Sequence, residues 1–292
     1  MSVTADNDLT RLIERLHRVL DRVEPLLPER RETDFDALAY RWRPPGGLQP
    51  IRRPHLLPPE DLLGVDAQKM ALLANTEQFV AGLPANNALL WGSRGTGKSS
   101  LIKAVLAAFH ARGLRLIEVD KHDLAALPEI VEQVEDRPER YLIFCDDLSF
   151  EADDPSYKTL KAILDGSLST PPHNLLIYAT SNRRHLLPEF QSENQAARIV
   201  DGELHHGEAV EEKTSLSERF GLWLSFYPFT QEQYLEIVRH WLRRLEAQTE
   251  DEEALRLEAL RFARARGSRS GRVAWQFARD YAGRQGLRQL PE

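Results

Sequence analysis

Residues 92–99 read Gly-Ser-Arg-Gly-Thr-Gly-Lys-Ser and match the pattern G-x-x-x-x-G-K-[ST]. Glycines at these positions let the backbone turn inward, so that its N–H groups surround a bound phosphate. The lysine of such a loop reaches the outer phosphates, and the Ser or Thr after it supplies an oxygen to Mg²⁺. The segment therefore predicts a nucleoside triphosphate site made by Gly92, Ser93, Arg94, Gly95, Thr96, Gly97, Lys98, Ser99 and Ser100.

The residues on either side of this loop have the patterns that it requires. An apolar run at residues 88–91 predicts a buried strand that leads into the loop. After the loop, apolar residues recur at helical spacing up to Phe109, and Gly113 marks the end of that helix. A strand before the loop and a helix after it make a chance match less probable.

Further apolar runs alternate with helical patterns, which is typical of a parallel sheet with helices on both faces. We expect strands at residues 88–91, 114–119, 141–145, 175–180 and 222–226. From Thr230 onward only helical patterns remain, and Thr230 with Gln233 fits a capping box. The predicted fold is α/β, with a parallel β-sheet core and a C-terminal helical lid.

Three regions are expected along the chain. Residues 1–58 hold an amphipathic helix at 9–27 and an extended Pro- and Arg-rich connector at 41–59. Residues 59–229 form the nucleotide-binding domain, and residues 230–292 form the lid. Within the second region, the polar stretch 186–214 is too long for an ordinary connector and is expected to be functional or disordered.

The formal charge of −7 argues against a protein that coats nucleic acid over its whole surface, because Lys and Arg contacts with phosphates supply most non-specific affinity. A local basic patch stays compatible with that charge. Residues 260–289 carry eight arginines and a single acid. We interpret them as a solvated helix face with one or two phosphate contacts, with a DNA-binding surface as the alternative.

The sequence also predicts a cellular setting. No stretch approaches the roughly 20 apolar residues of a membrane span, and residues 1–38 lack the apolar core of a signal peptide. Cys145 is the single cysteine, so an internal disulfide is excluded. We therefore expect a cytoplasmic protein without a membrane partner.

Two carboxylates follow the strand predicted at 141–145. Asp146 is assigned to Mg²⁺ together with Ser99, and Asp147 is the candidate that polarises the attacking water. Glu151 is a weaker rival for that second role. The strand predicted at 175–180 is followed by Asn182, whose amide can hold a water near the γ-phosphate.

Taken in order, these motifs resemble the AAA+ ATPases. The segments 89–100, 144–151, 178–184 and 217–224 resemble more closely a bacterial AAA+ family known as a domain of unknown function, DUF 815. The similarity spans roughly residues 42–281. It implies an ATP-binding P-loop fold that uses Mg²⁺, assembles into homo-oligomers and acts on a macromolecular client.

The resemblance also implies roles for single residues. Asn182 resembles sensor 1, Arg219 resembles the arginine finger offered to a neighbouring subunit, and Arg272 resembles the sensor 2 residue of the lid. Arg269 competes with Arg272 for that role, and a salt bridge to a nearby acid is the alternative for Arg219. The segment Leu63, Gly64 and Val65 resembles the one that covers the adenine.

The chain departs from the family pattern at two places. The second acid after the strand is usually Glu in this class, but here it is Asp147, as it is in the initiators and helicase loaders of the class. Hydrolysis is therefore expected to be slow or triggered by a partner. Residues 120–124 lack the aromatic and glycine pair with which AAA+ unfoldases grip polypeptides.

Two functions follow from these features. The leading hypothesis is an ATPase that hydrolyses ATP at subunit interfaces and remodels or loads a partner, protein or nucleic acid. The second is a slow ATP-controlled switch of initiator or helicase-loader type that acts with nucleic acid. A small-molecule kinase is disfavoured, because it leaves Arg219 and the helical lid without a role.

Overall fold

The computed structural model describes residues 15–18, 34–45, 47–150, 156–165, 172–184, 186, 198–200, 203–205, 216–249 and 251–289. Most of the helix predicted at 9–27 and most of the polar stretch 186–214 lie outside these residues. Within that stretch, β7 (Arg198–Val200) and β8 (Glu203–His205) pair as antiparallel strands. No helix in the described part of the chain is long and apolar enough to cross a membrane.

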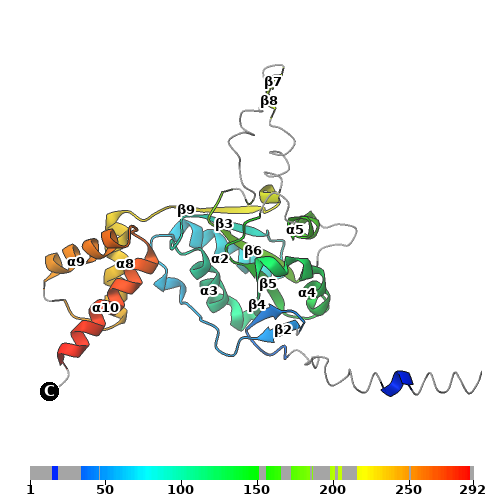
Figure 1. Cartoon of the computed structure of the whole chain (residues 1–292), viewed down its shortest axis with the longest axis horizontal. Coiled ribbons are helices and arrows are strands. Elements are labelled where there is room, and N and C mark those ends of the chain that lie inside the picture. Colours follow the sequence, from blue (N-terminus) through cyan, green and yellow to red (C-terminus); the bar gives the residue numbers. More distant parts are fainter. Residues whose placement is uncertain are drawn as a thin grey trace, which may run out of the picture.

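A seven-stranded sheet forms the centre of the molecule, with the strand order β2-β1-β4-β5-β6-β3-β9 (Figure 1). Five of its strands are those expected from the sequence: β3 (Ala88–Gly92), β4 (Leu114–Val119), β5 (Arg140–Cys145), β6 (Leu175–Ser181) and β9 (Leu222–Phe226). These five pair in parallel. The predicted α/β class with a parallel core is confirmed.

The other two strands, β1 (Ala39–Arg43) and β2 (Gly47–Pro50), correct the extended connector predicted at 41–59. β1 pairs in parallel with β4, and β2 pairs antiparallel with β1 at the edge of the sheet. The Pro- and Arg-rich composition hides them, although Tyr40, Trp42 and Leu48 are buried. The sheet therefore begins before residue 59, where the sequence places the start of the nucleotide-binding domain.

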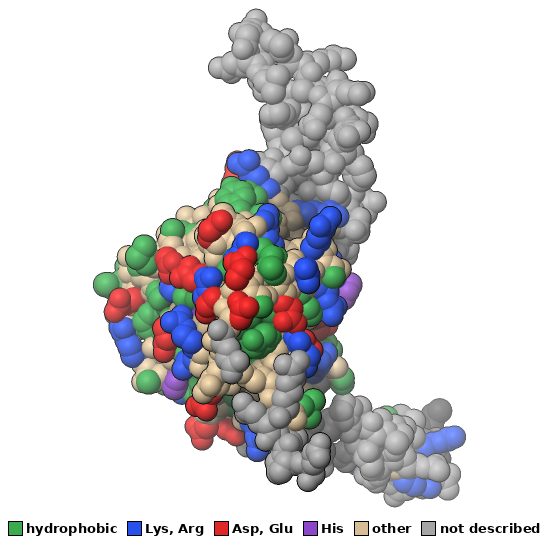
Figure 2. Space-filling model, turned by 90° about the vertical axis from the view of Figure 1, so that its left-hand side faces the viewer, with side chains coloured by type: hydrophobic (Ala, Val, Ile, Leu, Met, Phe, Trp, Pro, Cys, Tyr) green, Lys and Arg blue, Asp and Glu red, His purple; other side chains and the backbone are tan. Residues whose placement is uncertain are grey.

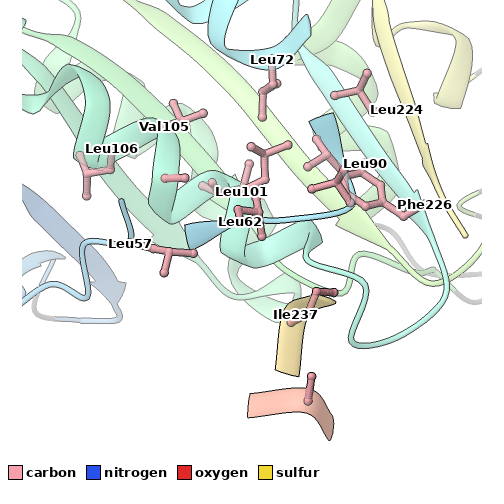
Figure 3. Packing of buried hydrophobic residues seen from close by; sticks show 14 of the residues in the cluster. Leu57, Leu62, Leu72, Leu90, Leu101, Val105, Leu106, Leu224, Phe226 and Ile237 are labelled. Carbon is pink, nitrogen blue, oxygen red and sulfur yellow. The ribbon is translucent and has the colours of Figure 1, made fainter. Parts of the chain in front are cut away.

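The sheet lies between two apolar layers because its strands bury both faces. In β5, Tyr141, Ile143 and Cys145 belong to one buried cluster, while Leu142 and Phe144 belong to the other. The first layer contains α4 (Leu127–Val134), which follows the 3₁₀ turn Lys121–Ala126, and α5 (Ser156–Asp165). The second contains α2 (Asp66–Val80) and α3 (Lys98–Phe109), whose packing against β3 and β9 is shown in Figure 3.

Three helices follow the sheet and gather at one end of the molecule (Figure 1): α8 (Gln231–Arg244), α9 (Glu252–Ala265) and α10 (Gly271–Gln289). The predicted capping box at the start of α8 is present, with Thr230 and Gln233 each accepting a backbone N–H of the other. Buried side chains of all three helices join the α2–α3 layer. The three helices are thus packed onto the α2–α3 side of the sheet.

Candidate nucleotide-binding site

A cleft of about 830 Å³ lies where the carboxyl ends of β3, β5 and β6 meet the lid. Because parallel strands end at the same edge of a sheet, residues distant in the sequence are brought together there. Residues 94–100 of the phosphate loop line this cleft, together with Asp146, Asp147, Asn182 and Arg272. The arrangement joins the motifs that the sequence identified separately.

The loop has a backbone that its glycines make possible. Gly92 has a φ of 131°, and a Cβ there would lie 2.0 Å from the carbonyl oxygen of Phe226. Gly97 has a φ of 105° at the position before α3, a conformation that side chains disfavour. No described residue accepts a hydrogen bond from the N–H groups of Gly95, Thr96 or Gly97. Unsatisfied donors at a helix N-terminus suit phosphate oxygens.

Lys98 is the first residue of α3 and is buried, with 7% of its surface exposed. Its ammonium donates hydrogen bonds to the carbonyl oxygens of Gly92 and Ser93, at 2.7 and 2.8 Å, and to Oδ1 of Asn182 at 3.1 Å. These contacts hold the ammonium at the centre of the loop. They place it beside Asn182, the residue predicted to hold a water near the γ-phosphate.

Burial lowers the pKa of the Lys98 ammonium below its usual range. The carboxylates of Asp147 and Asp146 oppose that shift, while the guanidinium groups of Arg94 and Arg272 add to it. Three cationic side chains therefore act on one small volume of the cleft. A polyphosphate supplies the negative charge that such a volume lacks, so the residues present fit a nucleoside triphosphate.

Asp146 is fixed by two hydroxyl groups from neighbouring elements. Its Oδ1 accepts a hydrogen bond from Ser99 at 2.6 Å and another from Thr180 at 2.5 Å. Hydroxyl and carboxylate oxygens are the ligand type that Mg²⁺ prefers, and this ion is usually bound by few protein groups plus phosphates and waters. The oxygen set at the cleft therefore fits a magnesium ion held by Ser99 and Asp146.

Asp147 differs from Asp146 in its backbone and its partners. It has a φ of 52°, which is uncommon for a residue other than glycine, and its N–H donates to Thr180 Oγ1 at 2.9 Å. Its carboxylate accepts a hydrogen bond from the side-chain amide of Asn182 and lies 3.7 Å from the guanidinium of Arg94. The two predicted water-handling groups, Asp147 and Asn182, are therefore direct neighbours.

The far wall of the cleft is apolar and comes partly from the lid. Of the segment predicted to cover the adenine, Leu63 lines the cleft, whereas Gly64 packs against Phe229 and Val65 is buried in the core. The lid contributes two tryptophans, Trp241 of α8 and Trp275 of α10, whose rings are 4.6 Å apart. Aromatic and aliphatic surface of this kind suits a flat purine base.

Sequence reasoning missed the roles of Thr180, Trp241 and Trp275 at this site. Both tryptophans fall on apolar helix faces, which predicts core positions, and Trp241 is indeed partly buried against the core. Periodicity identifies the apolar face of a helix, but it does not show which residues of that face pack in the core and which line a cleft. Thr180 lies one residue before the end of β6. Its position in a strand that ends at the phosphate loop is the sequence signal that could have identified it as a site residue.

Three other candidates lie elsewhere. Arg219 does not line the cleft, and its guanidinium forms an ion pair with Asp165 of α5, the alternative considered for it. Arg269 lines a separate groove, whereas Arg272 lines the cleft. Glu151, the rival for the role of Asp147, lies outside the described residues.

The lid is tied to the cleft by polar contacts at both ends. The N–H of Gly271, at the start of α10, donates to the carbonyl oxygen of Gly95 in the phosphate loop at 2.9 Å. On the opposite wall, the buried carboxylate of Asp61 accepts hydrogen bonds from Arg244 at 2.7 and 2.8 Å and contacts His240 at 2.9 Å. Movement of the lid would therefore directly displace the phosphate loop, because the two are joined by a hydrogen bond.

The model of a protein family described as "Protein of unknown function (DUF815)" matches residues 35–285. No curated protein matches the chain. Among solved structures, Aeropyrum pernix ORC1 in complex with DNA has a TM-score of 0.55 and 18% identity, over 80% of this chain and 65% of that one.

A variant of Thermotoga maritima RuvB has a TM-score of 0.51 and 17% identity, over 76% of this chain and 64% of that one. The T. maritima RuvB Holliday junction branch migration motor has a TM-score of 0.49 and 19% identity. The chain spans 62% of the length of that protein. At these identities the similarity to ORC1 and to the RuvB variant shows the fold, which is the AAA+ P-loop NTPase fold with a C-terminal helical region.

Proposed function

Since this chain belongs to the DUF815 family and has the AAA+ fold, we propose that it binds ATP with Mg²⁺ in the cleft and hydrolyses the γ-phosphate bond. One observation carries the proposal. The buried Lys98, the hydrogen-bonded pair of Ser99 and Asp146, and the pair of Asp147 and Asn182 meet in one cleft. These groups supply phosphate binding, metal binding and water activation, which phosphoryl transfer to water requires.

Each residue has a role that its surroundings support. The loop N–H groups and Lys98 would hold the β- and γ-phosphates, and Ser99 with Asp146 would hold Mg²⁺, which would supply positive charge against the phosphates. Asp147 accepts a proton from the attacking water, and Asn182 keeps that carboxylate and the water in position. Arg272, at the start of α10, contacts the γ-phosphate from the lid side of the cleft.

The proposal extends to assembly. Arg219 lies outside the cleft of its own chain and is proposed to serve the nucleotide of a neighbouring copy, after release from Asp165. A homo-oligomer with sites at its subunit interfaces follows from this role. The work of hydrolysis is proposed to be the remodelling or loading of a macromolecular partner.

A slow switch is the second candidate function, and a specific observation favours it. The Asp147 carboxylate lies 3.7 Å from Arg94 and accepts a hydrogen bond from Asn182, so both groups compete with an attacking water for it. A partner that removes Arg94 from Asp147 would then trigger hydrolysis. The two candidates differ in turnover rate and share the site.

The test is a paired measurement of ATP binding and steady-state ATP hydrolysis on the wild type and the Lys98→Ala variant. The proposal predicts that the variant loses both, because the loop loses its buried ammonium. The control is Lys158→Ala, which removes an exposed lysine of α5 that does not line the cleft. Equal ATP affinity in the wild type and the Lys98→Ala variant would overturn the proposal.

A further inference from the structure

A second groove, of about 720 Å³, lies beside the nucleotide cleft between the phosphate loop and the lid. Ser93 and Arg94 of the loop form one side of it. Arg264, in the last turn of α9, and Ser268 and Arg269, in the turn before α10, form the other. Three arginines, Arg94, Arg264 and Arg269, therefore line one groove, and Arg264 and Arg269 have no role in the proposed ATPase reaction.

The groove belongs to a part of the lid with an unusual charge distribution. Residues 259–279 contain six arginines and no acid, in a chain whose formal charge is −7. Other lid arginines are neutralised: Arg256 pairs with Glu253, and Arg284 pairs with Glu258 and Asp280. Among the described residues, no acid lies within ion-pair distance of Arg264 or Arg269.

This positive charge is local. The face of the lid visible in Figure 2 carries acidic and basic side chains side by side. Like charges held together on a folded surface repel one another, and an otherwise acidic chain does not need them for solubility. Such a cluster of positive charge is suited to bind a polyanionic partner.

Arg94 connects the groove with the nucleotide cleft, because its side chain lines both. The side chain is 78% exposed, and its Nη2 lies 3.7 Å from Oδ2 of Asp147. An exposed ion pair at that distance is weak. A phosphate bound in the groove between Arg94 and Arg269 would compete with Asp147 for the same guanidinium.

We propose that this groove binds the phosphodiester backbone of a nucleic acid, and that binding draws Arg94 away from Asp147 and so accelerates ATP hydrolysis. The second half rests on the proposed function. Nucleic acid is the partner we select because Arg261, also exposed, precedes Arg264 by one helical turn on the same face of α9, so a row of arginines faces a row of phosphates. Contacts of this kind position a backbone without reading its sequence.

The first test measures binding without ATP, by fluorescence anisotropy of a labelled mixed-sequence DNA duplex. We expect the double variant Arg264→Gln, Arg269→Gln to bind at least about 10-fold more weakly than the wild type. The slope d(log K)/d(log[salt]) should become less negative by about 1.8, because two phosphate contacts are lost. The matched control is Arg239→Gln, Arg256→Gln, which removes two lid arginines that pair with glutamates. Equal affinities of the two double variants would overturn the proposal, as would binding to polyglutamate and not to the duplex.

The second test measures ATP hydrolysis with and without the same duplex. We expect the duplex to raise the wild-type rate, and the Arg264→Gln, Arg269→Gln variant to keep the basal rate but lose the increase. Arg94→Gln should raise the basal rate and lose the increase, because Asp147 then no longer faces the Arg94 guanidinium and keeps only its hydrogen bond with Asn182. An unchanged response of either variant to the duplex would contradict the coupling. If the wild type and both variants lack ATPase activity but the Arg264→Gln, Arg269→Gln variant still binds the duplex more weakly, the proposed function is wrong and the proposed DNA site is supported.

Discussion

The hydroxyl group of Ser99 donates a hydrogen bond of 2.6 Å to the carboxylate of Asp146, across 47 residues of sequence. Ser99 lies in the first turn of α3, and Asp146 directly follows β5. Two oxygen ligands suited to Mg²⁺ are thus already in contact at the mouth of the phosphate loop. This pair of oxygens is the part of the site proposed to bind Mg²⁺.

Replacing Asp146 with Asn should therefore weaken the Mg²⁺ dependence of ATP binding. The amide keeps the size of the side chain but lacks its charge. In the presence of Mg²⁺ we expect ATP affinity to fall by at least about 10-fold, since even outer-shell partners of bound metals contribute that much. Affinity measured in EDTA should match that of the wild type, and an identical Mg²⁺ response in both proteins would contradict the assignment.

Arg219→Ala should spare ATP binding and lower hydrolysis, by roughly 10³ to 10⁵ if the residue acts as an arginine finger. Mixing it with Lys98→Ala subunits should restore some activity, because some interfaces then combine an intact arginine with an intact loop. Asp165→Asn breaks the ion pair with Arg219 from the other side. If that variant loses as much activity as Arg219→Ala, the arginine acts by holding α5 and the role in a neighbouring site is wrong.

Much of this site follows from the sequence because the phosphate loop and parallel strands determine it. Once β3, β5 and β6 are recognised as parallel, Lys98, Asp146 and Asn182 must meet at their carboxyl ends. The contact between Arg94 and Asp147 does not follow, since it depends on the positive φ of Asp147 and on side-chain directions. The strand β1 was missed for a different reason: prolines and arginines around it conceal its short alternation.

The carboxylate of Asp61 should contribute stability that depends on pH. Burial alone would raise its pKa, but the hydrogen bonds from Arg244 and His240 hold that pKa below its usual value. A lowered folded-state pKa stabilises the protein above the unfolded pKa of about 3.9, and the contribution is lost as the pH falls through the folded value.

We therefore expect Asp61→Asn to lower the melting temperature at pH 7, where Arg244 and His240 lose a charged partner. The difference from the wild type should shrink below about pH 4, as the native carboxylate becomes protonated. Thermal unfolding followed by circular dichroism over this range checks the prediction. A difference that stays constant with pH would mean that the carboxylate charge is not what joins the lid to the cleft.

The central claim, that the cleft hydrolyses ATP through Asp147, is tested most directly by the Asp147→Asn variant. Its amide keeps the size of the side chain and leaves Asp146 for Mg²⁺, but it cannot accept the proton of the attacking water. ATP affinity and single-turnover hydrolysis are measured on the same protein. The account predicts wild-type affinity with hydrolysis slowed by about 10² to 10⁴, whereas an unchanged single-turnover rate, or a loss of ATP binding, would contradict it.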